Sequence, residues 1–393
     1  MAATRKQYSV SLTNRVLYLA FELGWSEWTL AFTTGAAEAP RLVKVRARDM
    51  GKVLAEIRKA KARFRLAAQA PVKSCYEAGR DGFWLHRWLI HQGIENIVVD
   101  SASIEVNRRA RRAKSDRLDA GKLVQMMARY AGGEKRIWSV VRVPSKEDED
   151  QRQLHRELQQ LKGERTEHSN RIKGLLAAQG LEVKVGVKLA GQLDELRTWD
   201  GRALGTGLRQ RLLRELARWQ CLEEQIQQIE KAREQELCCG KHPAVGQVRC
   251  LLGLRGIGMA SSWLFVVEFF GWRRIRNRRQ LASLAGLTPS PYNSGDSERD
   301  QGISKAGNRR VRGMAVEIAW SWLRYQKDSA LSLWYWQRFG KGSKRLRRIG
   351  IVALARKLLV ALWRYLEHGE VPQGAIEVDW RTKVKVGIAA ALA

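Results

Sequence analysis

The spacing of apolar residues changes near residue 140, and this change sets what the chain can fold into. Residues 15–32 form an apolar strand pattern, a turn at Gly24 and a second strand pattern, which predicts a hairpin. Helical and strand patterns then alternate at residues 53–69, 72–79, 83–93 and 94–100. Such alternation predicts a mixed α/β sheet domain, which we place over residues 10–135.

Beyond that point the sequence is typical of long polar helices over residues 136–240. Apolar residues recur at steps of three and four in two runs, as expected for a coiled coil. The first run contains Leu154, Leu158, Leu161, Ile172 and Leu175, and the second contains Leu212, Leu216, Trp219, Leu222, Ile226 and Ile229. The pattern does not decide whether the two helices pair within one chain or between chains.

The third region, residues 241–393, is predicted to be largely helical and is strongly basic. The whole chain has 71 Lys and Arg against 40 Asp and Glu, a formal net charge of +31. Such an imbalance indicates a polyanionic partner, most commonly nucleic acid. One basic run is usually a solvated face, whereas several in one region favour a phosphate-binding surface. The basic runs are residues 271–280, 307–313 and 340–348.

The sequence does not have the features of a membrane-spanning protein or of a disulfide-rich protein. No stretch approaches the roughly 20 apolar residues of a spanning helix, and five cysteines are too few for a disulfide framework. Cys238, Cys239 and His242 lie close together, but a structural zinc site takes four ligands and no second pair is present. We therefore expect a cytoplasmic protein without a zinc site.

Four carboxylates are candidates for metal-dependent chemistry. Glu22 and Glu77 follow strand patterns, and Asp116 and Asp119 are spaced to share one face of a helix. Oxygen ligands suit Mg²⁺, and a pair of such ions can stabilise the entering and leaving oxygens of a phosphoryl transfer. Acidic residues are also common on solvated helices. Asp100 and Glu105 are alternative candidates.

A second group of candidates lies in the third region. Gly256 and Gly258 precede an apolar helix, where backbone N–H groups can bind phosphate, although a tight turn between packed helices explains them as well. Ser294 is placed in a turn-rich loop before Gly295, with Ser290 and Ser297 as alternatives. A serine hydroxyl needs activation and nearby cations to attack a phosphate. The nearby cations are Lys305, Arg309, Arg310 and Arg312.

The first strand, the segment "YEAGRDGFWLHRWL" and the segment "RRAKSDRLDAGKLV" resemble the RuvC-like (RNase H-fold) domain of the DEDD-type insertion-sequence transposases, the bridge-RNA-guided recombinases. The resemblance assigns Glu77 to the family's Glu position, and Asp116 and Asp119 to its Asp-Arg-x-Asp element. The family usually has Asp where this chain has Glu22, which is one methylene longer and still able to bind a metal.

Residues 279–320 resemble the C-terminal core of the same family. The resemblance implies that Ser294 is the nucleophile, with the metal-binding carboxylates completing the site. It further implies Mg²⁺ as cofactor, DNA and a structured bridge RNA as partners, and recombination of an insertion sequence through a phosphoserine link. Because recombination holds two duplexes at once, we expect a homo-oligomer, a dimer or a tetramer.

Two alternatives remain open at this point. A RuvC-like junction-resolving nuclease would cut DNA with water and need no serine. A non-catalytic nucleic-acid-binding protein would explain the charge without using the carboxylates, and Glu22 in place of Asp keeps that alternative open.

Overall fold

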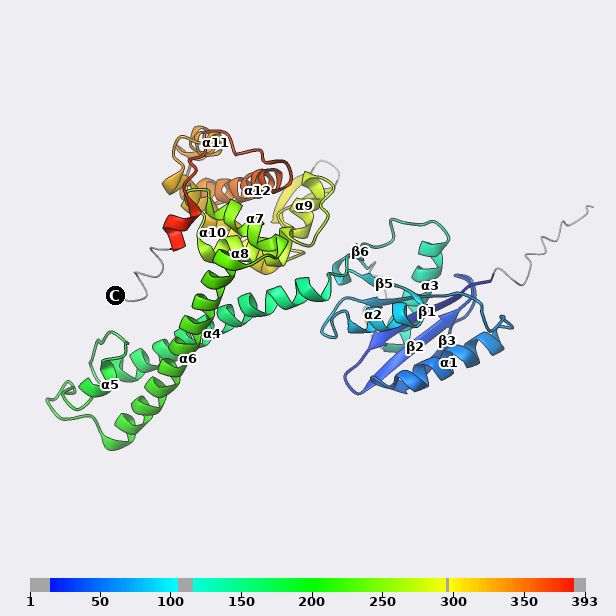
Figure 1. Ribbon diagram of the computed structural model, residues 1–393, viewed down its shortest axis with the longest axis horizontal. Coiled ribbons are helices and arrows are strands. Elements are labelled where there is room, and N and C mark those ends of the chain that lie inside the picture. The colour runs from blue at the N-terminus through cyan, green and yellow to red at the C-terminus, as the bar shows by residue number, and fades with distance from the viewer. Residues whose placement is uncertain (1–14, 105–115, 295–296, 385–393) are drawn as a thin grey trace, which may run out of the picture. The chain divides into compact units, whose positions relative to one another are not determined.

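The computed structural model describes residues 15–104, 116–294 and 297–384, and the side chains of these residues except those of Ala102 and 291–301. Two compact units make up the chain, Met1–Val143 and Pro144–Ala393 (Figure 1). The second unit therefore contains both the region predicted as coiled coil and the basic C-terminal region.

The first unit is built on a mixed six-stranded sheet with the strand order β3-β2-β1-β4-β5-β6. β1, β2 and β3 run antiparallel, β4 and β5 are parallel to β1, and β6 is antiparallel to β5. The strands are β1 (Leu17–Leu23), β2 (Glu27–Thr33), β3 (Arg41–Arg46), β4 (Val72–Glu77), β5 (Glu95–Val99) and β6 (Val140–Val141).

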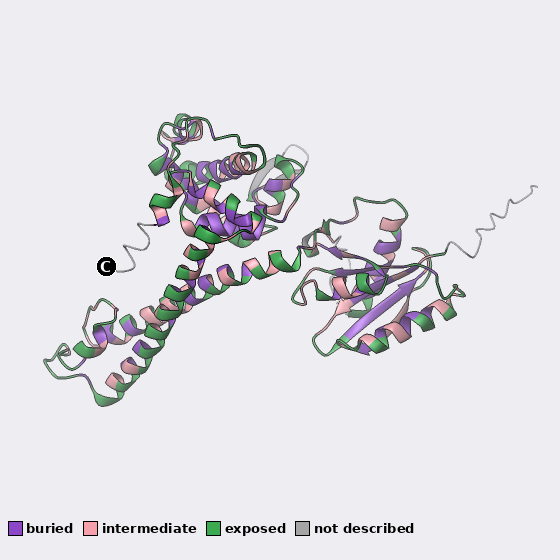
Figure 2. Cartoon of the chain, in the orientation of Figure 1, coloured by how far each residue is buried: buried purple, intermediate pink, exposed green. Residues whose placement is uncertain are grey.

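Three helices cover the sheet, and each face has its own hydrophobic core. α1 (Met50–Arg63) and α2 (Trp84–His91) contribute apolar side chains to one core, and α3 (Asp116–Ala131) contributes to the other. Figure 2 shows the central strands as largely buried. The predicted hairpin and the alternation of strands and helices are present, whereas β3 and the two-residue strand β6 were not predicted. β3 is an edge strand in which three basic side chains interrupt three apolar ones, so it lacks a continuous apolar run.

The second unit begins with a long helical hairpin. α4 (Lys146–Ala177) and α6 (Thr206–Cys239) run antiparallel and pair within the chain, because Lys162 binds Glu230 and Arg165 binds Glu223. Their apolar contact includes Leu158, Leu161, Leu222, Ile226 and Ile229. The leucine pattern is thus used inside one chain. A short helix, α5 (Leu189–Gln192), lies in the connection between them.

The rest of the second unit is a helical bundle around one large core, with a two-stranded β-hairpin attached. Its helices are α7 (Pro243–Leu252), α8 (Met259–Phe265), the π-helix η4 (Val266–Phe270), α9 (Arg278–Leu284), α10 (Arg309–Tyr325), α11 (Ala330–Phe339) and α12 (Lys344–His368). No helix in the described ranges is long and apolar enough to cross a membrane.

The β-hairpin corrects one sequence prediction. Residues 289–294, expected as a turn-rich loop, form strand β7 (Pro289–Ser294), which pairs with β8 (Ser297–Ile303). Two prolines are tolerated because each strand of a two-stranded sheet has one unpaired side, and the register shifts between Pro289 and Pro291.

Candidate active site

Glu22 and Glu77 are neighbours at the carboxyl ends of two parallel strands. The last paired residues of β1 and β4 are Phe21 and Tyr76, and each glutamate is the next residue on its strand. Paired strands lie about 4.8 Å apart. Residues two apart on a strand share a face, and Ala20 and Cys75 belong to the core formed with α3. Both glutamates therefore lie on the α3 side of the sheet, where Glu77 is exposed.

The two aspartates lie in the first turn of α3, the helix that packs on this same face. Asp116 is exposed and Asp119 is half-buried. The helix is held against the sheet by fully buried Ala120, and Cys75 Sγ lies 3.9 Å from the carbonyl oxygen of Leu123. Asp116 and Asp119 thus belong to the helix that packs on the sheet face where Glu22 and Glu77 lie.

The four carboxylates are arranged as two pairs. Among the described residues, no three His, Cys, Asp or Glu side chains lie close enough together to hold a metal ion. The donor chemistry still suits Mg²⁺, because all four groups offer carboxylate oxygens. Of the alternative acidic residues, Asp100 follows β5 and alternates to the opposite face from Val99, which lies in the α3 core. Glu105 lies outside the described residues.

An exposed tryptophan stands at the same strand ends, and sequence reasoning did not find it. Trp25, in the β1–β2 turn, is 69% exposed, and the guanidinium groups of Arg48 and Arg80 both lie 5.0 Å from its ring centroid. Asp81 accepts hydrogen bonds from both arginines at 3.3 and 3.5 Å. Trp25 lies three residues beyond Glu22, and Arg80 lies three residues beyond Glu77, so these contacts hold two cations near the ends of β1 and β4. No spacing signal in the sequence connects these four residues.

Ser294 is the last residue of β7, and its backbone pairs with that of Ser297 across the hairpin. The side chains of both serines lie outside the described part, whereas Ser290 is half-buried within β7. The base of the hairpin is fixed by close backbone packing. Gly307 has φ +94°, and a Cβ there would lie 2.3 Å from the carbonyl oxygen of Leu284. The serine is therefore carried on a strand anchored at a position that requires glycine.

The four basic residues beyond the hairpin have different surroundings. Lys305 and Arg309 are exposed. Arg310 forms an ion pair with Glu268 at 3.3 Å, and Arg312 donates to the carbonyl oxygen of Ala285 at 3.4 Å. Lys305 and Arg309 therefore have the freer side chains, while Arg310 and Arg312 also stabilise the bundle.

Gly256 and Gly258 form a turn that packs inside the bundle. Gly256 has φ +88°, and its carbonyl oxygen accepts a hydrogen bond from Ser321 at 2.7 Å. The N–H of Gly258 donates to Ser261 Oγ at 3.1 Å. These contacts give the turn a packing role, and phosphate binding at this turn remains a prediction.

A buried polar cluster joins the helical hairpin to the bundle. Burial favours the neutral form of Glu268, but hydrogen bonding and charge from Arg156, together with the charge of Arg310, hold its pKa below the usual value. Burial, followed by the charge of Arg233, lowers the pKa of His155 to about 4. Neither ring nitrogen of His155 has a hydrogen-bond partner among the described residues. This histidine is therefore neutral at pH 7.

Comparison with known proteins decides the family. A sequence model described as the transposase IS116/IS110/IS902 family matches residues 248–335. The protein y4rJ of Sinorhizobium fredii, named as a transposase, is 42% identical over 373 residues, covering 92% of this chain and 94% of y4rJ. The chain belongs to this transposase family.

More distant relatives carry insertion-sequence names. The transposase of element IS1111A from Coxiella burnetii is 26% identical over 266 residues, 65% of this chain and 68% of the relative. That of element IS1328 from Yersinia enterocolitica is 24% identical over 218 residues, 56% of this chain and 63% of the relative. The prediction of an insertion-sequence transposase is thereby confirmed, and the family match includes the serine-bearing hairpin of the transposase.

Proposed function

We propose that this transposase cleaves and rejoins DNA through a covalent phosphoserine link formed by Ser294. The observation that carries the proposal is the placement of Glu22 beside Glu77 on the α3 face, because neighbouring carboxylates at the ends of two separate strands offer oxygen ligands to a metal ion that assists phosphoryl transfer. The proposal includes the RuvC-like assignment of the first unit.

Ser294 Oγ forms a bond to phosphorus as the bond from phosphorus to a sugar oxygen breaks, and that oxygen leaves with a proton as a hydroxyl. The serine proton passes to a carboxylate or to water. Attack by another strand's hydroxyl reverses the step and restores Ser294, so the phosphodiester is rejoined without loss of its energy. Mg²⁺, when bound by Glu22, Glu77, Asp116 and Asp119, would neutralise charge on the reacting phosphate. Arg48 and Arg80, held on Trp25 at the same strand ends, would supply positive charge for a phosphate bound beside these carboxylates.

We further propose a bridge RNA and a homo-oligomer, a dimer or tetramer, as the working assembly. A net charge of +31 is sufficient to bind both RNA and DNA. The apolar contact between α4 and α6 is used within the chain, so subunits must associate through other surfaces.

Trapping of a protein–DNA adduct tests the proposal. Purified transposase is incubated with labelled DNA carrying the element ends and with the RNA that copurifies with it, then denatured. We expect a labelled band that protease removes. Cleaved DNA without an adduct would instead indicate a nuclease that uses water. DNA that stays intact with every divalent metal ion tested would indicate a non-catalytic binding protein.

A further inference from the structure

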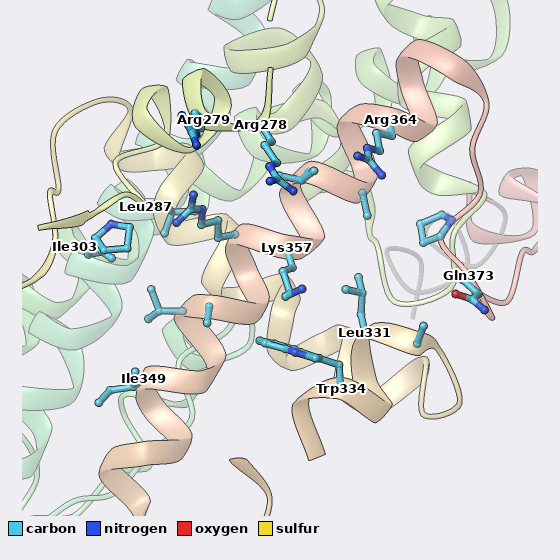
Figure 3. A pocket seen from close by; sticks show the side chains of 18 of the residues that line it. Arg278, Arg279, Leu287, Ile303, Leu331, Trp334, Ile349, Lys357, Arg364 and Gln373 are labelled. Atoms are coloured by element: carbon cyan, nitrogen blue, oxygen red, sulfur yellow. The ribbon is translucent and has the colours of Figure 1, made fainter. Parts of the chain in front are cut away.

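A large groove runs along α12 and is shared by segments far apart in the sequence. It has a volume of about 1070 Å³ and is walled by α12, α11, the start of α9 and the base of the β-hairpin (Figure 3). We call it the α12 groove. Its size suits a ligand at the upper end of the roughly 300–1,000 Å³ typical of small-molecule sites.

The groove is strongly cationic. Residues from two basic runs, 271–280 and 340–348, meet in it, together with three cations farther along α12. Glu370 is the one carboxylate of the described lining, and no ion pair involving the lining cations occurs in the described part of the chain. Such a surface attracts a polyanion. The lining cations are Arg278, Arg279, Arg345, Arg348, Arg356, Lys357 and Arg364.

Between the cations the groove is apolar. Small and branched side chains of α12, including Ala353 and Ala361, leave the hollow that Ile303 and Trp334 help to wall. In Figure 3 Lys357 and Trp334 extend toward one another, and Lys357 Nζ lies 4.6 Å from the indole centroid. A duplex keeps the faces of its bases stacked inside, so it presents phosphates, sugars and base edges to such a lining but no base face. An unpaired strand presents both phosphates and base faces, which suits a lining of cations and apolar groups.

The groove also begins where the serine-bearing hairpin begins. Pro289 and Ile303, which line the groove, are paired at the base of β7 and β8, and Ser294 ends the same strand. Five residues of extended chain span roughly 17 Å at about 3.3 Å per residue. That length corresponds to about five phosphates of one strand at the roughly 3.4 Å axial rise of duplex DNA, and to fewer phosphates of an extended unpaired strand.

We propose that the α12 groove binds an unpaired DNA strand close to the phosphate that Ser294 attacks, with phosphates on the arginines and at least one base against the apolar wall. The inference rests on the proposed function for its position in the reaction, but the binding itself needs no chemistry.

The charge reversal R348E/R356E tests the phosphate contacts. Its matched control is R211E/R214E, the same change of charge on exposed arginines of α6. Binding of a fluorescent 12-nucleotide oligo(dT) is measured by anisotropy at several salt concentrations. We expect the groove variant to bind at least about tenfold more weakly with a shallower salt slope, and the control to lose much less. Equal losses in the two variants would overturn the groove assignment.

Abasic sites and a filled groove test the base contact. An oligonucleotide of abasic nucleotides keeps its phosphates, so we expect it to bind about tenfold more weakly than oligo(dT). Ala353→Trp fills the hollow without changing charge, so it should abolish the difference in binding between abasic and normal strands. It should also abolish the fluorescence change of a 2-aminopurine base placed in the bound oligonucleotide. The melting temperature of this variant shows whether it folds. Equal binding of abasic and normal strands to the unaltered protein would refute the base contact even if Ala353→Trp fails to fold.

Two further experiments distinguish binding of a DNA strand from binding of duplex DNA or RNA, and distinguish groove binding from the serine mechanism. R348E/R356E should weaken the binding of a 12-base-pair duplex or a 12-nucleotide RNA less than it weakens the binding of oligo(dT). A binding defect confined to the duplex or to the RNA would overturn the proposal of a DNA strand. The Ser294→Ala variant should bind oligo(dT) normally. If it does while no adduct ever forms in the unaltered protein, the groove inference stands and the serine mechanism fails.

Discussion

Glu22 and Glu77 stand side by side across the β1–β4 pair, one residue beyond the pairing of Phe21 with Tyr76. We expect Glu77→Ala to reduce DNA cleavage at least about 100-fold, because loss of a metal ligand removes several kcal/mol of transition-state stabilisation. DNA binding should change little. The control is Glu27→Ala on the same sheet, whose ion pair with Lys44 is exposed and contributes little. Cleavage that survives Glu77→Ala would remove the carboxylates from the mechanism, and Asp119→Ala should behave as Glu77→Ala does.

Substitutions at residue 22 separate the charge of the side chain, which a metal ligand needs, from its size. Glu22→Asp restores the residue usual in the resembling family and should keep activity, since a carboxylate remains. Glu22→Gln should lose most of it, because a neutral amide is a poorer ligand for Mg²⁺. The readout is cleavage rate against Mg²⁺ concentration. Equal rates for Gln and Glu would exclude residue 22 as a metal ligand.

Gly307 supports the serine-bearing hairpin through its backbone. Gly307→Ala should destabilise the second unit by roughly 2–4 kcal/mol, because φ is +94° and the added Cβ would lie 2.3 Å from the Leu284 carbonyl oxygen. Gly313→Ala is the control, since a Cβ at this position in α10 meets nothing within 4 Å and alanine favours a helix. Denaturant unfolding distinguishes them, and equal stability of the two variants would contradict the anchoring role.

His155 should make folding stability depend on pH. Its pKa is about 4 in the folded chain, against an ordinary value near 6.5 when unfolded, because of burial and then the charge of Arg233. The unfolded chain therefore binds the proton first as pH falls. The contribution of neutral His155 to the free energy of unfolding is fully present above about pH 6.5 and is lost as the pH falls toward 4. Between pH 7 and pH 5 the free energy of unfolding should fall by about 2 kcal/mol.

The pH effect is measured by denaturant unfolding at pH 7 and pH 5. His155→Leu should remove most of this decline, whereas His91→Asn, at an exposed position in the first unit, should leave it unchanged. An identical decline in His155→Leu would assign the effect to other groups.

The local pattern of apolar and polar residues predicted much of the fold. The β1–β2 hairpin follows from two apolar strand patterns on either side of a turn at Gly24, and the shared placement of Asp116 and Asp119 follows from helical spacing. Strand β7 could not be predicted, because Pro289 and Pro291 oppose strand formation and only pairing with β8 makes the segment extended.

Contacts between distant segments were out of reach of sequence reasoning. Arg278 and Arg356 line one groove only because the bundle packs α9 near α12, and Trp25 meets Arg48 and Arg80 only through the arrangement of the sheet. The pairing of α4 with α6 was equally undecided, since the same leucines satisfy contacts within one chain or between two.

Ser294 provides the sharpest distinction between a recombinase and a nuclease. If its hydroxyl attacks DNA, Ser294→Ala should eliminate both the protease-sensitive adduct and all recombinants, since no other atom replaces the lost oxygen. Specific DNA binding should stay almost unchanged, because one neutral hydroxyl adds little to a highly charged interface. Ser290→Ala and Ser297→Ala should each retain the adduct, and Ser294→Cys should retain at most a trace of activity. The measurement is a denaturing gel of labelled DNA with and without protease. Recombination by Ser294→Ala would show that water or another residue opens the strand.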